Sequence, residues 1–294
     1  MSDTDLTIGL VLPDVLGTYG DDGNALVLRQ RARMRGLTAE IHRLTLGEPV
    51  PETLDVYTLG GGEDTAQIVA TEHLAADGGL ARAAAAGRPV LAICAGLQVL
   101  GESFRASGRV VGGLGILDAT TSGLAHRMIG EIRSEPVTPA APAGTGASAG
   151  DGDSAGSGAG TGAGARTGTD WTAALTDTLT GFANHMGATI LGPDARPLGR
   201  LTHGTGNTDA AGAAAAGLDG EEAERQIRAE GVVQGSVVAT YMHGPALARN
   251  PQLADALLAQ ATGTTVAELP PLDGDLAEQV TREVARLRAE RLRS

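Results

Sequence analysis

The chain has 294 residues and one cysteine, and its 35 acidic and 22 basic side chains give a formal charge of −13. This length allows a buried core in one large or two small domains, the acidic balance argues against nucleic-acid binding, and one cysteine excludes an internal disulfide framework and a cysteine-rich zinc site. No apolar run approaches the roughly 20 residues that span a bilayer, and the N-terminus carries two acids where a signal peptide is basic, so we expect a soluble cytoplasmic protein.

Strand and helix patterns alternate through the first part of the chain. The predicted elements are a strand at Thr7–Pro13, a helix at Asn24–Gly36, strands at Ala39–Leu44 and Asp55–Leu59, a helix at Ala66–Ala86, a strand at Pro89–Cys94 and a helix at Leu97–Phe104. The strands are short apolar runs bounded by turn residues, which is typical of buried parallel strands. This alternation predicts an α/β fold with a mostly parallel sheet, in which a ligand site lies beyond the carboxyl ends of the strands.

Composition changes abruptly in the middle of the chain. From Pro139 to Asp170, all but four of the 32 residues are Gly, Ala, Ser, Thr or Pro, and none is Leu, Ile, Val or Phe. Such a segment cannot bury enough apolar surface to offset the entropy of ordering it, so we expect a disordered insertion. A second low-complexity stretch, Thr205–Gly220, is predicted to be a surface loop.

The sequence after the insertion continues the same predicted domain. A strand over Val237–Pro245 runs into a polar end, and a helix follows at Asn250–Thr262. The Arg-rich helix at Ala277–Leu292 presents either a solvated face, which we favour, or a contact with a partner. We therefore predict one domain over residues 6–262, interrupted at about 139–170, and a C-terminal helical extension over 263–294.

Cys94 is the strongest candidate for catalysis. It stands where the apolar strand PVLAIC stops and the helix AGLQVLGES begins, with the small residues Ala92 and Gly96 two positions before and after it. This context is typical of a nucleophile elbow, a sharp turn that projects a reactive side chain. The positive end of the helix favours a thiolate, and the Ala95 N–H would be one oxyanion donor. The alternative is a buried structural cysteine.

A cysteine nucleophile usually works with a histidine base. Among the six histidines, His243 lies at the end of the ATYMHGP strand, where sites of α/β folds gather. Gly244 and Pro245 then force a turn that can aim its ring at the strand ends. His185, in GFANHMG, is the competitor, and we favour His243 from its position.

Three weaker features complete the candidate site. The Gly60–Gly61–Gly62 run follows a strand and can supply a second oxyanion donor, with a plain tight turn as the alternative. Arg127 suits a carboxylate because its guanidinium donates two parallel hydrogen bonds. Gln98 is a further candidate for substrate contact. Taken singly, Arg127 and Gln98 would each be interpreted as a solvated surface group rather than as a substrate contact.

The chain contains no lysine, and all of its strongly basic side chains are arginines. A Walker A loop uses a lysine on the nucleotide phosphates, so the chain cannot carry that loop in its standard form. Schiff-base chemistry through lysine is excluded as well. If the reaction uses ATP, we expect another polypeptide to bind it.

Together these residues resemble the class I glutamine amidotransferases. Cys94 to Gln98 matches the C-x-G-x-Q elbow of that class, and Gly60 to Gly62 matches its oxyanion loop. The resemblance implies a three-layer α/β fold and a Cys–His pair that hydrolyses glutamine and passes ammonia to a partner domain. The commonest members of the class carry Glu two positions after the base, where this chain has Pro245. The TYMHGP ending instead resembles the cobyric-acid-synthase branch, which lacks that Glu.

Within that branch the chain is similar to the glutaminase subunits of lipid II isoglutaminyl synthases. The similarity rests on the blocks TIGLVLPDVLGTYGDDGNALVLRQRARMRG, LGGGEDTAQ, ICAGLQVLG, RMIGEI, TGFANHMG and ATYMHGPALARNP. It implies a heterodimer with a MurT-like Mur-ligase subunit, which holds ATP and Mg²⁺ and amidates the D-glutamate of the lipid II stem peptide to D-isoglutamine. It implies no cofactor and no metal in this chain, and no membrane insertion.

The resemblance also implies a role for each matched residue. Cys94 would be the nucleophile and His243 the general base. Arg127 would bind the α-carboxylate of glutamine, and Gln98 with the Gly61 and Gly62 backbone would line the same pocket.

Two departures from the family pattern stand out, the long insertion and Ala183 in place of the Glu of GFENH. Because no acid follows His243 at the usual spacing, we expect the partner to supply the group that orients this imidazole, or none to be needed.

Other interpretations stay open. One is a cysteine hydrolase of different specificity on the same scaffold, such as a peptidase or a deglycase-like enzyme. Another is a catalytically silent subunit that only scaffolds a ligase. A third is a glutaminase for cobyric acid or cobyrinate amidation, although those synthases carry an ATP-binding domain ahead of this module.

Overall fold

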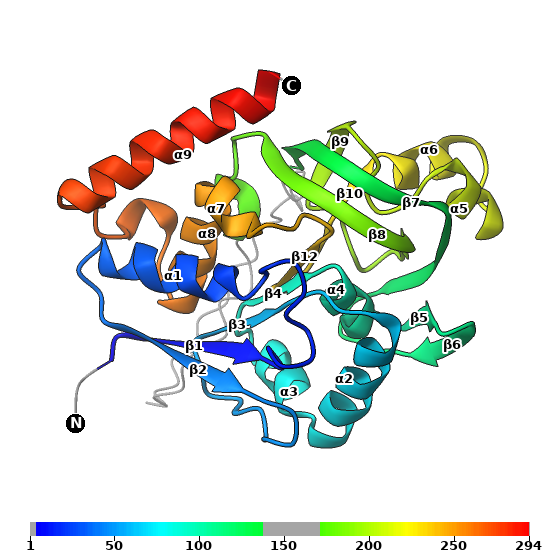
Figure 1. Ribbon diagram of the computed structural model, residues 1–294, viewed down its shortest axis with the longest axis horizontal. Helices are drawn as coiled ribbons and strands as arrows, with labels where there is room; N and C mark the ends of the chain where they lie inside the picture. Colours follow the sequence, from blue (N-terminus) through cyan, green and yellow to red (C-terminus); the bar gives the residue numbers. More distant parts are fainter. Residues whose placement is uncertain (1–3, 138–170, 294) are drawn as a thin grey trace, which may run out of the picture.

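A central, mostly parallel sheet organises the fold (Figure 1). The structure is a computed structural model that describes residues 4–137 and 171–293. The sheet has the strand order β11 (Val232–Gln234), β12 (Val237–Thr240), β4 (Val90–Ile93), β3 (Val56–Leu59), β1 (Leu6–Val11) and β2 (Ala39–Leu44). Neighbouring strands are parallel except β11, which is antiparallel to β12. The predicted α/β fold with a mostly parallel sheet is confirmed.

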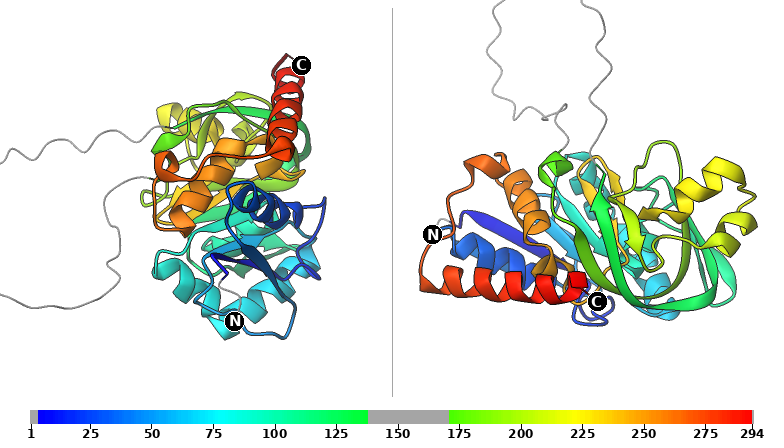
Figure 2. Two further views of the ribbon diagram at one scale, coloured as in Figure 1. Left: turned by 90° about the vertical axis from the view of Figure 1, so that its left-hand side faces the viewer. Right: turned by 90° about the horizontal axis from the view of Figure 1, so that it is seen from above.

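Helices cover both faces of this sheet, which gives the three-layer arrangement. Helices α1 (Gly23–Arg33) and α8 (Pro251–Ala261) lie on one face, and α2 (Asp64–Asp77) and α3 (Gly79–Ala85) lie on the other (Figures 1 and 2). Every residue of β3 and β4 is buried, as expected of parallel strands covered on both sides.

A second sheet, which the sequence patterns do not predict, packs beside the first. Its strand order is β10 (Ala229–Glu230), β9 (Gly199–His203), β7 (Ala119–Pro136), β5 (Ser103–Ala106) and β6 (Arg109–Gly112), with β8 (Leu179–Leu191) paired along β7. All of its pairs are antiparallel except β5 with β7. The long β7–β8 ribbon has a register shift between Gly123 and Met128.

Two predicted helices are wrong in their extent. The segment Ala66–Ala86 divides at Gly78, whose φ of 70° is left-handed, so α2 ends and α3 begins there. The Asp77 carboxylate accepts the Gly79 N–H and holds the break. The segment Leu97–Phe104 is also shorter than predicted, because helix α4 (Ala95–Leu100) ends early and Phe104 lies in β5.

The stretch Thr205–Gly220 is not the surface loop that its composition predicts. It contains helix α5 (Ala210–Ala215), whose N-cap Asp209 accepts the Gly212 N–H at 2.7 Å, and it leads into α6 (Gly220–Ile227). Asn207 is fully buried and exchanges two hydrogen bonds with the Gly231 backbone. The predicted insertion Pro139–Asp170 lies outside the described residues.

The C-terminal part adds short elements and one long helix. These are the 3₁₀ turns η1 (Trp171–Ala174) and η2 (Val266–Glu268), and helices α7 (Ala246–Arg249) and α9 (Asp275–Arg293). Most residues of α9 are exposed, while its Arg288 donates to the carbonyl oxygens of Arg249 and Thr178. Among the residues of both described segments, no helix combines the length and apolar character needed to cross a bilayer.

A nearly buried ion cluster joins α1 to α8. Asp255 of α8 accepts two hydrogen bonds from the Arg31 guanidinium, at 2.8 and 2.7 Å, and pairs with Arg35 at 2.8 Å. The three side chains are only 8 to 14 % exposed. Removing the carboxylate would leave two guanidinium groups buried without their partner.

We therefore expect Asp255→Ala to lower the free energy of unfolding by about 3 kcal/mol. Urea denaturation measures this loss. The matched control is Glu224→Ala, which breaks an exposed pair with Arg228 and should cost no more than about 1 kcal/mol. Equal losses in the two variants would contradict the role of burial.

Candidate active site

Cys94 sits in a strained turn between β4 and α4. Its backbone has φ 52° and ψ −104°, a left-handed conformation that non-glycine residues rarely adopt. The Cys94 N–H donates to the Thr240 carbonyl oxygen at 2.8 Å, which ties the turn to β12. A Cβ on Gly96 would lie 3.1 Å from the Gly60 oxygen and 3.3 Å from Ala92 Cβ, so the predicted small residues are required here. The sharp strand–turn–helix geometry expected at Cys94 is present, and the role of Cys94 as a nucleophile stays a prediction.

His243 follows β12 and is 1 % exposed. Its N–H donates to the Phe182 carbonyl oxygen of β8 at 2.9 Å. Its Nδ1 lies 3.0 and 3.1 Å from the two carboxylate oxygens of Asp21, whose side chain is fully buried. An acid that contacts His243 is therefore in this chain, so the expectation that the partner supplies this group is wrong.

Gly61 lies at the centre of these three side chains. A Cβ built on it would lie 3.0 Å from His243 Cε1, 3.2 Å from Asp21 Oδ2 and 3.4 Å from Cys94 Cβ. The structure thus brings cysteine, histidine and aspartate to one point at the carboxyl ends of the parallel strands. The Gly61 N–H donates to Asp21 at 2.9 Å, so it is not available as the oxyanion donor, which leaves Gly60 and Gly62 as the candidates from this loop.

The charge state of His243 follows from its neighbours. Burial lowers the pKa of His243, but the hydrogen bond to Asp21 and the interactions with Cys94 outweigh burial and raise that pKa to about 9. His243 Nε2 is buried and has no hydrogen-bond partner within residues 4–137 and 171–293. At neutral pH the ring is therefore protonated. Asp21 contacts its Nδ1, and its Nε2 is available to donate a hydrogen bond or a proton.

The loop between β1 and α1 delivers Asp21. Leu12 and Tyr19 both have positive φ, 50° and 61°, and the Thr18 N–H donates to the Gly61 oxygen at 3.1 Å. The Tyr19 ring packs edge-on against His243 with centroids 4.9 Å apart. Sequence reasoning missed Asp21 because it lies 222 residues from its partner. The available signal was an acidic pair in a glycine-rich loop after the first strand.

The competing histidine, His185, lies beside the site but is held differently. Its ring stacks on Tyr241 with centroids 3.8 Å apart, and Nδ1 hydrogen-bonds the Gly187 oxygen. Burial lowers the pKa of His185 to about 4, against the smaller effect of the Gly187 hydrogen bond, so the ring is neutral. Asp21 contacts His243 instead, which favours His243 as the partner of Cys94.

The structure places the two predicted substrate contacts near His185. Gln98 is buried on α4, one turn after Cys94, and donates to the Tyr241 hydroxyl at 3.1 Å. Arg127, on β7, is exposed and donates to Asn184 Oδ1 at 2.7 Å. The positive charge of Arg127 also lowers the pKa of His185, so Arg127 lies close enough to influence that ring.

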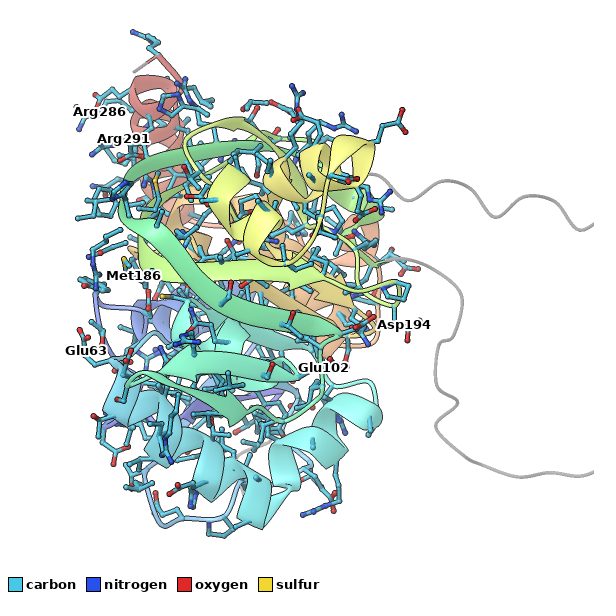
Figure 3. All side chains as sticks on the ribbon, turned by 90° about the vertical axis from the view of Figure 1, so that its right-hand side faces the viewer. Glu63, Glu102, Met186, Asp194, Arg286 and Arg291 are labelled. Carbon is cyan, nitrogen blue, oxygen red and sulfur yellow. The ribbon has the colours of Figure 1, made fainter. Side chains whose placement is uncertain are left out.

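The second sheet contacts the site through β8, whose Phe182 oxygen accepts the His243 N–H. Figure 3 shows Met186 of β8 and Glu63, which follows the glycine loop, on the same side of the molecule. Met186 is 42 % exposed although its neighbour His185 is buried, because successive side chains of a strand point to opposite faces. The described residues form no group of three or more His, Cys, Asp or Glu that could hold a metal.

Comparison with known proteins relates this chain to glutamine amidotransferases. Residues 7–251 match the CobB/CobQ-like glutamine amidotransferase domain. The chain is 30 % identical to the GatD subunit of the glutamine-hydrolysing lipid II isoglutaminyl synthase of Staphylococcus aureus N315, over 87 % of this chain and 84 % of that protein. It is 27 % identical to the GatD subunit of Streptococcus pneumoniae R6, over 95 % of this chain and 90 % of that protein. A crystal structure of a glutamine amidotransferase is also similar, with 16 % identity and a TM-score of 0.47. The match covers 86 % of this chain and 98 % of the chain in that structure.

The Asp21–His243 contact predicts a measurable titration. NMR of the His243 ring should give a pKa near 9 in the wild-type chain and a lower pKa in Asp21→Asn, because the amide no longer stabilises the imidazolium. His185, which does not contact Asp21, serves as an internal reference and should keep its low pKa. An unchanged His243 pKa in Asp21→Asn would contradict the assignment.

Proposed function

This chain belongs to the family of CobB/CobQ-like glutamine amidotransferase domains, and from that premise we propose that it hydrolyses L-glutamine to glutamate and ammonia. The observation that carries the proposal is the Cys94–His243–Asp21 arrangement around Gly61. Cysteine, an imidazolium and a buried carboxylate in this order form the machinery of acyl transfer through a thioester.

In the first half of the reaction, the Cys94 sulfur attacks the side-chain amide carbon of glutamine. The C–N bond then breaks, and the protonated His243 gives its proton to the departing ammonia. Asp21 holds the ring so that Nε2 faces the reacting atoms. A γ-glutamyl thioester on Cys94 and a neutral His243 result.

In the second half, water attacks the thioester while His243 accepts a proton from it. The C–S bond breaks, glutamate leaves, and the sulfur and His243 return to their starting states. Both tetrahedral oxyanions need backbone donors. Ala95 is the first residue of α4, so its N–H has no helical partner, and the Gly60 or Gly62 N–H is the donor from the glycine loop.

We further propose how the amino acid is held. Arg127 would pair with the α-carboxylate of glutamine through its planar guanidinium, and its contact with Asn184 steadies it on the ribbon. Gln98 and the Gly61 and Gly62 backbone would line the pocket around the side chain.

The relatives named as GatD subunits support a place for this chain in a lipid II isoglutaminyl synthase. There it would form a heterodimer with a MurT-like ligase, which binds ATP and Mg²⁺ and amidates the D-glutamate of the lipid II stem peptide. The lack of lysine in this chain agrees with ATP binding by the partner. Such a complex would work in the cytoplasm, and ammonia would pass directly between the two sites.

We expect the purified chain to release ammonia from L-glutamine and Cys94→Ala to release none, because the thioester cannot form without the sulfur. Coupled glutamate dehydrogenase detects the ammonia, and the assay is repeated with a co-expressed MurT-like ligase in case release needs the partner. Silence in both assays would reject the glutaminase proposal and favour a cysteine hydrolase of other specificity or a scaffold subunit.

Arg127 can be tested separately. Arg127→Ala should raise KM for L-glutamine by roughly 10-fold or more with a smaller change in kcat, because a carboxylate contact remote from the reacting bond contributes similarly to substrate and transition state. Arg133→Ala, which removes an arginine of the same strand, is the matched control and should leave KM unchanged. A fall in kcat at constant KM would contradict the assigned role.

A further inference from the structure

Thr240, the last residue of β12, contacts the segments that carry both catalytic side chains. Its carbonyl oxygen accepts the Cys94 N–H at 2.8 Å. Its hydroxyl oxygen accepts the Met242 N–H at 3.0 Å, and Met242 immediately precedes His243. One residue therefore fixes the strained turn at the nucleophile and the exit of the chain towards the base.

The Thr240 hydroxyl is itself held by a buried acid. It donates to Oε1 of Glu230, which lies on β10 of the second sheet and has no exposed surface. The Tyr241 backbone and the Ser134 side chain also lie near this carboxyl group and act to lower its pKa. The Glu230 side chain thus receives the Thr240 hydrogen bond at the point where β12 turns towards His243.

Burying the Glu230 carboxyl group is energetically unfavourable, and packing alone does not explain why an acid occupies this position. Burial, partly offset by the hydrogen bond from Thr240, raises the pKa of Glu230 to about 7. A buried carboxyl group is unfavourable unless hydrogen bonds compensate for the lost solvent, and among the residues that the structure describes the second oxygen of Glu230 has no hydrogen-bond partner. Leucine or methionine would fill the same space without this penalty.

We propose that Glu230 and Thr240 form a positioning pair that sets the distance between Cys94 and His243. Neither side chain touches the substrate. Glu230 orients the Thr240 hydroxyl, the hydroxyl fixes Met242, and the Thr240 carbonyl fixes Cys94. Loss of the pair would let the imidazole move relative to the sulfur, and small displacements of reacting groups are costly in rate.

The test compares disruptive with conservative variants. Thr240→Val and Glu230→Ala remove the hydrogen bonds, whereas Thr240→Ser and Glu230→Gln keep a hydroxyl donor and an acceptor oxygen. We expect kcat for glutamine hydrolysis to fall by ~10-fold or more in the disruptive variants, with KM within about two-fold, and to stay within about three-fold in the conservative ones. Thr71→Val is the matched control, because it removes a buried hydroxyl that bonds only to a helix carbonyl, and it should keep kcat.

A second readout separates this inference from the proposed function, on which its kinetic arm rests. Cys94 is the only cysteine, so the rate of iodoacetamide alkylation at pH 7 reports its environment without glutamine. We expect slower alkylation in Thr240→Val and Glu230→Ala and wild-type rates in the conservative variants. If the wild-type chain hydrolyses no glutamine, this readout still decides the inference.

Three results would overturn the positioning role. They are unchanged kcat and alkylation in Glu230→Ala, equal losses in Glu230→Gln and Glu230→Ala, and a loss that appears in KM alone. Urea denaturation identifies variants that fail to fold. If Thr240→Val is among them, the comparison of Glu230→Ala with Glu230→Gln decides.

Discussion

The left-handed backbone at Cys94 is the constraint on which the rest of the site depends. A non-glycine residue in such a conformation costs of order 1–3 kcal/mol and persists only where its surroundings hold it. Here the buried strand β4 precedes it, the Thr240 oxygen accepts its N–H, and Gly96 allows α4 to pack against the Gly60 backbone. The turn fixes the position of Cys94 at the edge of the sheet, so every other group of the site must reach that one position.

The parallel topology of the first sheet explains how residues far apart in the sequence reach the position of Cys94. Asp21, Gly61, Cys94 and His243 follow β1, β3, β4 and β12, four strands that are consecutive in the sheet. Because parallel strands end at the same edge, the loops after them meet without any long connection. The buried Asp21 charge is then matched by the His243 imidazolium and by the Gly61 N–H, so the site contains no buried carboxylate without donors.

Local signals in the sequence were sufficient for the parallel strands of the first sheet and for two of the three side chains that meet at Gly61. The strand Ala39–Leu44 has its predicted limits, and the change from PVLAIC to AGLQ marks the elbow. The failures have physical causes, which are contacts between residues distant in the chain, a single backbone angle, or a lack of apolar periodicity. Asp21 is assigned only by its proximity to His243, and the helix break at Gly78 depends on one left-handed residue. The α5 helix is composed of Ala and Gly alone, so it has no apolar periodicity to reveal it.

The second sheet has a direct part in the site, although its strands gave no clear signal in the sequence. β8 holds the His243 backbone through the Phe182 oxygen and holds Arg127 through Asn184. β10 contributes Glu230 to the end of β12. The parallel sheet therefore places Cys94 and Asp21, while the mostly antiparallel sheet restrains His243 and the predicted carboxylate-binding Arg127. A displacement between the two sheets would change the distance from His243 to Cys94 without altering either strand, which makes their contact at Thr240 the point where the geometry of the pair is decided.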